Sequence, residues 1–433
     1  MFETLKNAWK VADIRKKILF TALILVIFRI GSAIPVPFLD ASVMRNWMGT
    51  VNDGNLLGYI DVLTGGAFSS ATVFALSISP YITSSIVIQL LTIAIPALER
   101  MAKEGEEGRR RINKITRYTA MGLGLIQATA YYIMLRNMGA LTYKSGFSGV
   151  SSAIVIILTF VGGTALIIWL GDQIDSKGIG NGISMMLFAG ILSRGPAAVS
   201  KLWAYIQLAN EGHTQYYFLV PAVVILFVVI IAFIVMMTNA ERRIPVQYAK
   251  RVVGRKMYGG QSTHIPIKVN MSGVMPIIFA SSLLAIPGTI GAFVNVKPDG
   301  FWAGFFALFS TNSWFYALLY FLLIIAFNYF YVAIQYNPIE MANNLQKNNG
   351  TIPGIRPGRS TSEFISKVIS KITLVGALFL GVVATLPILL SSVAGMNISL
   401  GGTSILIVVG VALDTMRQME SQMMMRHYKG FLE

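Results

Sequence analysis

Long apolar stretches alternate with shorter polar segments along the whole chain. Ten of these stretches are roughly 17 to 25 residues long, the length that crosses the hydrocarbon of a bilayer as a helix. Backbone N–H and C=O groups find no water there, and runs this continuously apolar differ from the alternating pattern of barrel strands. The pattern predicts an all-α polytopic membrane protein. The ten stretches lie at 18–34, 71–97, 116–135, 153–170, 183–205, 216–237, 272–293, 313–335, 369–390 and 402–419.

Basic residues are distributed unevenly between the two sides that ten crossings define. About 28 of the 35 Lys and Arg residues fall on the side that holds both termini. Arg29 lies inside the first stretch. Because basic residues are retained on the cytoplasmic side of membrane proteins, we expect both termini in the cytoplasm. The six on the opposite side are Arg45, Arg136, Lys144, Arg194, Lys201 and Lys297.

Interruptions in the pattern suggest internal symmetry. Pro80 and Pro276 lie early in the second and seventh stretches, which correspond if the helices divide as five plus five. An odd number of spans in each half reverses the topology of the second half. Interrupted helices at matching places in the two halves therefore indicate an inverted repeat around a central pathway. The halves would be 1–205, with helices 1 to 5, and 206–433, with helices 6 to 10. Proline is also common in membrane helices without function, so chance remains an alternative.

A polar, glycine-bearing segment at 55–70 precedes the second stretch. It is too short and too polar to cross the bilayer, and Gly65 and Gly66 permit a sharp bend. It is either an ordinary outer loop or a re-entrant segment, which is tolerated at membrane depth only where protein or water surrounds it. The fifth stretch is the weakest of the ten, because Arg194, Gly195, Pro196 and Lys201 interrupt its second half.

Two predicted cytoplasmic loops, at about 239–270 and 336–367, are far longer than a helix connection requires. The first interleaves six basic residues with Tyr248 and Tyr258, and the second carries Arg356 between prolines and glycines. Such surfaces suit a phosphate backbone or an acidic protein face. Positive charge on cytoplasmic loops also arises from topology alone, so the net charge of +16 does not decide between a docking site and a topology signal.

Composition narrows the function classes. The chain is 55% hydrophobic and 12% charged, which excludes an ordinary water-soluble fold. It has no cysteine, and its three histidines form no close ligand pair, so we expect no cofactor, metal or thiol chemistry. The chain contains no phosphate-binding GxxxxGK[ST] motif, so energy for any transport would come from a partner.

Several strings, in order along nearly the whole chain, resemble the SecY family, the channel-forming subunits of the Sec translocon. The resemblance implies a clamshell of two pseudo-symmetric five-helix halves that passes unfolded polypeptide and opens sideways to lipid, without enzymatic activity. The strings are FRIGSAIPVP (28–37), ALSISPYITSSIVIQLL (75–91), KEGEEGRRRINKITRY (103–118), GIGNGIS (178–184), ERRIPVQYAKR (241–251), QSTHIPIKVNMSGVMPIIFASS (261–282) and GGTSILIVV (401–409).

The resemblance also assigns functional residues. Periodicity alone would place Ile78 and Ile82 against lipid or another helix; the resemblance makes them part of an apolar pore ring. The ring residues are Ile78, Ile82, Ile183, Leu187, Ile278 and Ile407. The segment at 55–70 matches a re-entrant plug, and its central residues are Leu63, Thr64, Gly65, Gly66, Ala67 and Phe68. Polar residues of the lateral gate would be Thr83, Gln89 and Asn181. Those that dock the ribosome or SecA would be Arg243, Lys250, Arg251 and Arg356.

The same resemblance implies partners and a location. We expect the subunits SecE and SecG, the SecA ATPase, the ribosome with its RNA, signal peptides and preprotein substrates, and membrane lipid. The location would be the plasma membrane of a prokaryote. The alternative is an inverted-repeat secondary transporter of small solutes, although the spans offer few ionisable residues for ion coupling. An intramembrane enzyme is a third reading, but Asp172 and Asp175 are predicted in a short connection outside the helices.

Overall fold

The computed structural model describes residues 6, 8–50, 61–143, 146–211, 214–248, 251–253, 256–258, 262–293, 301–309, 313–394 and 402–429. A helix lies on each of the ten predicted stretches. These helices are α2 (Ala12–Gly31), α5 (Ser79–Ala94), α7 (Glu106–Asn137), α8 (Gly146–Lys177), α9 (Gly182–Ser193) with α10 (Gly195–Asn210), α11 (Gln215–Asn239), α12 (Met275–Phe293), α14 (Trp314–Gln335), α16 (Arg359–Ala394) and α17 (Gly402–Lys429). Shorter helices are α3 (Ala41–Thr50), α6 (Pro96–Lys103), α13 (Phe301–Leu308) and α15 (Pro338–Lys347).

The surfaces of the long helices are suited to hydrocarbon. Among the described residues, five helical segments are long and apolar enough to cross a membrane without further assumptions. On α11, Phe218, Ile225 and Val228 are exposed by 83%, 63% and 62%. Large aliphatic and aromatic side chains lie outward on a helix when the solvent is lipid, so the prediction of a polytopic α-helical membrane protein is confirmed.

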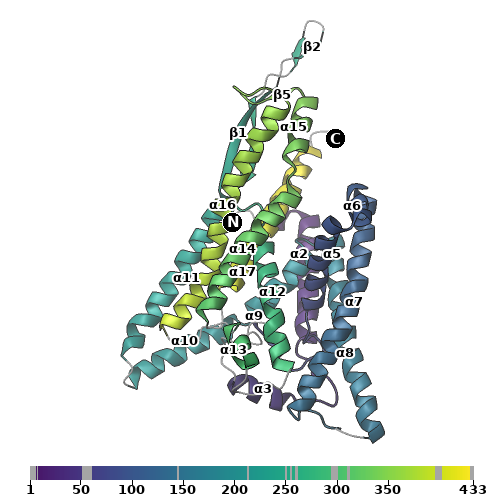
Figure 1. The fold of residues 1–433 in the computed structure, drawn as a ribbon, viewed down its shortest axis with the longest axis vertical. Coiled ribbons are helices and arrows are strands. Elements are labelled where there is room, and N and C mark those ends of the chain that lie inside the picture. The colour runs from purple at the N-terminus through teal and green to yellow at the C-terminus, as the bar shows by residue number, and fades with distance from the viewer. Residues whose placement is uncertain are drawn as a thin grey trace.

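The helices pack as neighbours around several apolar clusters. Helix α14 packs on α12 and α16, while α5 packs on α7 and α7 on α8. Helices far apart in the sequence also meet: α9 contacts α17, and α12 contacts α5 and α7. The strands and α15 lie at one end of the molecule and α3 at the other (Figure 1).

The second span begins later than its hydropathy predicts. The stretch at 71–97 is apolar throughout, yet residues 71–78 form turns and a bridge, and α5 starts at Ser79. Pro80 occupies the first turn of α5, where its missing N–H and fixed φ are tolerated. Ile78, expected on the helix, is its N-cap instead. Pro276 is likewise the second residue of α12, so both prolines start helices rather than interrupting them.

Two further expectations need correction. The fifth stretch is two helices, because α9 ends at Ser193 and α10 begins at Gly195 with Pro196 in its first turn. Asp172 and Asp175 were expected in a connection outside the helices, but both lie within α8, which continues to Lys177. Hydropathy marks where apolar residues end, whereas a helix continues as long as its backbone hydrogen bonds do.

The two long loops fold together as one small sheet. Strand β1 (Glu241–Tyr248) pairs antiparallel with β4 (Ser262–Lys268), with Ile244 opposite Ile265, and also with β5 (Gly350–Thr351), so the strand order is β4-β1-β5. A hairpin of β2 (Arg251–Val253) and β3 (Lys256–Tyr258) extends beyond it. The inward side chains of β1, Ile244 and Val246, are buried in an apolar cluster that includes residues of α14, α15 and α16. The sheet is therefore anchored to the helical bundle.

Candidate functional site

The six predicted ring residues come from four separate helices or their caps and meet in one hydrophobic cluster. Ile78 caps α5, Ile82 lies one turn later, Ile183 and Leu187 lie on α9, and the remaining two, Ile278 and Ile407, lie on α12 and α17. Ile78, Leu187 and Ile407 are buried; the other three are half-buried. We call this the ring cluster. The six predicted ring side chains are all aliphatic, so they offer no group that could bind one particular ligand.

The described part of the predicted plug, residues 61–70, packs directly against the ring cluster. We call these residues the plug segment. Ala67 is buried in the cluster and Leu63 packs at its edge. On the other side, the Phe68 ring contacts that of Tyr131 on α7, and the Tyr131 hydroxyl donates a hydrogen bond to the Phe68 carbonyl at 2.7 Å. The remaining predicted plug residues, 55–60, lie outside the described residues.

Two glycines allow the plug segment to approach α9 closely. Gly65 and Gly66 both have positive φ, at 67° and 89°, where side chains are strained. A Cβ atom at Gly65 would lie 2.7 Å from the Ser193 hydroxyl and 2.8 Å from the Gly190 carbonyl. The Gly65 carbonyl accepts a hydrogen bond from Arg29 Nη1 at 2.9 Å. Larger residues could not keep this backbone so near the helix.

Sequence reasoning missed the charged contacts of the plug segment. Asp61 forms an ion pair with Arg194, at the junction of α9 and α10. Arg194 was noted only as an interruption of the fifth span, and Asp61 was not singled out. The available signal was the presence of arginines within apolar stretches, because intramembrane charges usually have partners.

The predicted gate residues do not all lie together. Thr83 and Gln89 are half-buried on α5, the helix that contacts α12, and the Thr83 hydroxyl donates to the Ser79 carbonyl at 3.0 Å within its own helix. Asn181 lies at the N-terminus of α9, where its side-chain oxygen accepts the Ser184 amide N–H at 3.0 Å. Asn181 therefore acts as a helix cap in this structure.

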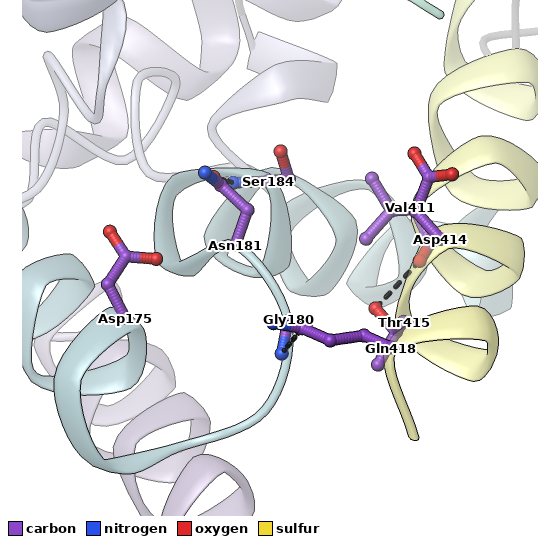
Figure 2. Close-up of a pocket in the computed structure, with 8 residues that line it drawn as sticks. All are labelled: Asp175, Gly180, Asn181, Ser184, Val411, Asp414, Thr415 and Gln418. Carbon is purple, nitrogen blue, oxygen red and sulfur yellow. Dashed lines mark hydrogen bonds between the residues drawn. The ribbon is translucent and has the colours of Figure 1, made fainter. Parts of the chain in front are cut away.

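Asn181 also lines a polar cavity of about 290 Å³ between the end of α8, the start of α9 and α17 (Figure 2). Asp175 and Asp414 contribute carboxylates to its wall. Its polar groups largely satisfy one another: Asp175 accepts the Gly182 amide N–H at 2.7 Å, and Gln418 accepts the Gly180 amide N–H at 2.7 Å. These bonds tie the start of α9 to both neighbouring helices. Its lining residues are Asp175, Gly180, Asn181, Ser184, Val411, Asp414, Thr415 and Gln418.

The predicted docking residues lie on the sheet and on the loop beside it. Arg243 is exposed on β1 and pairs with Glu241 at 2.7 Å. Arg356 is exposed in the turn after β5, and its carbonyl accepts the Thr361 hydroxyl at 2.9 Å. Because β5 pairs with β1, the structure joins the two loops that carry these arginines. Arg251 begins β2, and Lys250 lies outside the described residues.

The model of the SecY family matches residues 72–416. The chain belongs to the SecY family. Across their full lengths, the chain is 40% identical to the protein translocase subunit SecY of Thermotoga maritima over 437 residues, covering 100% of this chain and 98% of that one. It is 44% identical to the SecY subunit of Halalkalibacterium halodurans over 443 residues, covering 100% of both. The family consists of channel subunits rather than enzymes, and the chain is a multi-pass protein of the plasma membrane.

Solved structures share the fold. A protein-conducting channel has a TM-score of 0.65 at 18% identity, covering 94% of this chain and 92% of that one. Sec61 in the canine ribosome-channel complex from the endoplasmic reticulum has a TM-score of 0.61 at 17% identity, with the same coverage. The predicted SecY fold with a plug is confirmed, and nothing in these comparisons supports the solute transporter.

Proposed function

We propose that the ring cluster is the narrowest part of a polypeptide pathway through this chain. The observation that carries the proposal is that six aliphatic side chains meet in one hydrophobic cluster beside the plug segment: Ile78, Ile82, Ile183, Leu187, Ile278 and Ile407. A narrow apolar constriction excludes ions by dewetting. Flexible aliphatic side chains can close around a moving chain of any sequence, because they make no specific hydrogen bonds.

In this proposal the plug segment seals the ring at rest and leaves during transport. Only two of its six central residues, Leu63 and Ala67, pack in the ring cluster. Since apolar stabilisation scales with the area removed from water, a small contact is suited to a seal that must be displaced. Hydrophobic segments of the substrate would then leave sideways between α5 and α12, which contact each other, with Thr83, Gln89 and Asn181 as gate residues.

The proposed partners bind at the end that carries the sheet. With both termini in the cytoplasm, the exposed Arg243 and Arg356, together with Lys250 and Arg251, would face a ribosome or the SecA ATPase. Sec61 is described in a ribosome complex, and phosphate-rich RNA suits exposed arginines. Signal peptides and preproteins would be the substrates, and SecE and SecG the accompanying subunits. The two halves of the clamshell would be residues 1–205 and 206–433.

Reconstitution tests the proposal. Proteoliposomes that contain this chain with SecE, SecA and ATP should import a preprotein that carries a signal peptide. A preprotein halted midway should cross-link to photoreactive groups placed at positions 82 and 407. It should not cross-link to one at Ile225, which lies outward on α11 with 63% of its surface exposed. Equal labelling at all three positions, or no import, would refute the pathway.

A further inference from the structure

Two arginines that lie within the predicted apolar spans converge on the plug segment. Arg29 comes from α2 and Arg194 from the junction of α9 and α10. We propose that Asp61, Arg194 and Arg29 form an electrostatic clasp that holds the plug segment against the ring cluster and sets how readily a substrate displaces it. The proposal rests on the channel function proposed above.

The Asp61–Arg194 ion pair joins the plug to the helical bundle. The Asp61 side chain is only 5% exposed and that of Arg194 is 29% exposed. The second contact of Asp61 stays inside the plug segment, where its Oδ1 accepts the Ser69 amide N–H at 2.7 Å. Asp61 therefore links the two ends of the plug segment and also attaches it to α9. Because a buried charge that loses its partner is uncompensated, each partner holds the other in place.

The second attachment acts on the backbone at the middle of the plug segment. Arg29 Nη1 donates to the Gly65 carbonyl at 2.9 Å, and the Ser193 hydroxyl lies 3.5 Å from the same oxygen. A hydrogen bond from a charged donor is stronger than one between neutral groups. Gly66 lies beside the Arg194 guanidinium: a Cβ atom built on Gly66 would be 3.5 Å from that group. The plug is thus held from α2 and from α9.

These contacts differ from those that hold the bundle together. Ion pairs such as Arg117–Asp172, at 2.7 Å, connect two long helices, α7 and α8. The Asp61–Arg194 pair connects a long-helix junction only to the plug segment, so its loss should release the plug and leave the helices packed. Loss of the contact changes the free-energy difference between the sealed and unsealed channel by the amount that the contact contributed, so the unsealed population rises.

The experiment compares resting ion conductance and preprotein import for the same reconstituted protein. Asp61→Asn removes the charge but keeps an oxygen that can accept the Ser69 N–H, and Arg194→Gln removes the other charge. Each should raise the open probability without preprotein by at least about tenfold, while import is retained. Arg194→Lys should leak less than Arg194→Gln. The control is Arg136→Gln, at an exposed position in the last turn of α7.

The double variant Asp61→Asn with Arg194→Gln separates a clasp from two independent defects. Residues that act through one pair are non-additive, so the double variant should leak no more than the leakier single variant. Leaks that multiply would overturn the proposal. It would also be overturned if the parent imports preprotein but both single variants conduct no more than Arg136→Gln. A parent that imports nothing refutes the channel function itself.

A second readout follows the plug directly. The chain has no cysteine, so Ala67→Cys provides a single thiol, and Ala67 is 1% exposed in the ring cluster. Cysteine packs as a small apolar residue and should remain shielded while the plug is seated. A membrane-impermeant thiol reagent should label it about tenfold faster in the Asp61→Asn background. Unchanged labelling there would show that the plug remains seated without the ion pair.

Discussion

Replacing Ile407 by asparagine tests the dryness of the ring cluster. Ile407 lies on α17 and is 2% exposed within the hydrophobic ring cluster. Asparagine branches as leucine does but carries an amide in place of two methyl groups. Ile407→Leu is therefore the matched control, because it changes shape by a similar amount and keeps the site apolar.

The magnitude follows from the cost of burying the amide. A buried amide without a hydrogen-bond partner costs about 1–3 kcal/mol in proteins. The closed state bears this cost, because only there is position 407 packed in a dry cluster; in an open, wetted pathway water solvates the amide. The ratio of open to closed channels should therefore rise about 5- to 150-fold. The leucine variant conserves volume, costs less than about 1.5 kcal/mol, and buries no polar group.

Planar bilayer recordings without preprotein provide the assay. The asparagine variant should conduct ions at rest at least about fivefold more often than the leucine variant. The leucine variant should exceed the parent by no more than about tenfold, because its repacking costs less than about 1.5 kcal/mol. If both variants conduct alike, polarity at position 407 does not control the seal, and the reasoning that places a dewetted constriction there is refuted.

Three further perturbations test other parts of the structure. Arg356→Glu should weaken ribosome or SecA binding in a sedimentation assay by roughly tenfold while Arg136→Glu does not, because a charge reversal acts only where the partner docks. Gly182→Ala should lower the free energy of unfolding by about 1–3 kcal/mol in a thermal melt, because the added methyl group would lie 2.0 Å from a carbonyl oxygen of α8. The control Gly122→Ala has open space around the new methyl group and should be neutral or stabilising. The pKa of Asp40, followed by NMR, should lie below its ordinary value of 3.8, because the Ser42 hydroxyl and amide N–H donate hydrogen bonds to the carboxylate. These bonds stabilise the folded state above pH 3.8, and that stabilisation is lost as the pH falls through the lowered pKa.

Each of these predictions can fail separately. Equal binding by Arg356→Glu and the parent would remove that contact from the docking surface. If Gly182→Ala and Gly122→Ala melt at the same temperature, α8 and α9 can separate at little cost. An Asp40 titration at or above the ordinary pKa would mean that the serine contacts do not persist in solution.

The course of the chain across the membrane could be predicted from the sequence, but the ends of its helices could not. Hydropathy placed the span at 71–97, while α5 begins only at Ser79, because Pro80 suits a first helical turn and the preceding apolar residues are buried in turns. Asp172 and Asp175 show the opposite error, since the helix continues past the apolar run. The hydropathy pattern shows which residues suit hydrocarbon, whereas the length of a helix depends on how far its backbone hydrogen bonds continue.

The sequence by itself determined the class of the protein, its ten apolar segments and its family, because each depends on residue type and order along the chain. Only the tertiary structure decided which residues meet. Ile78 and Ile407 come from distant parts of the chain, the pairing of β1 with β5 joins two loops, and Asp61 finds Arg194. Such contacts depend on how helices cross and where strands align, which no local pattern encodes.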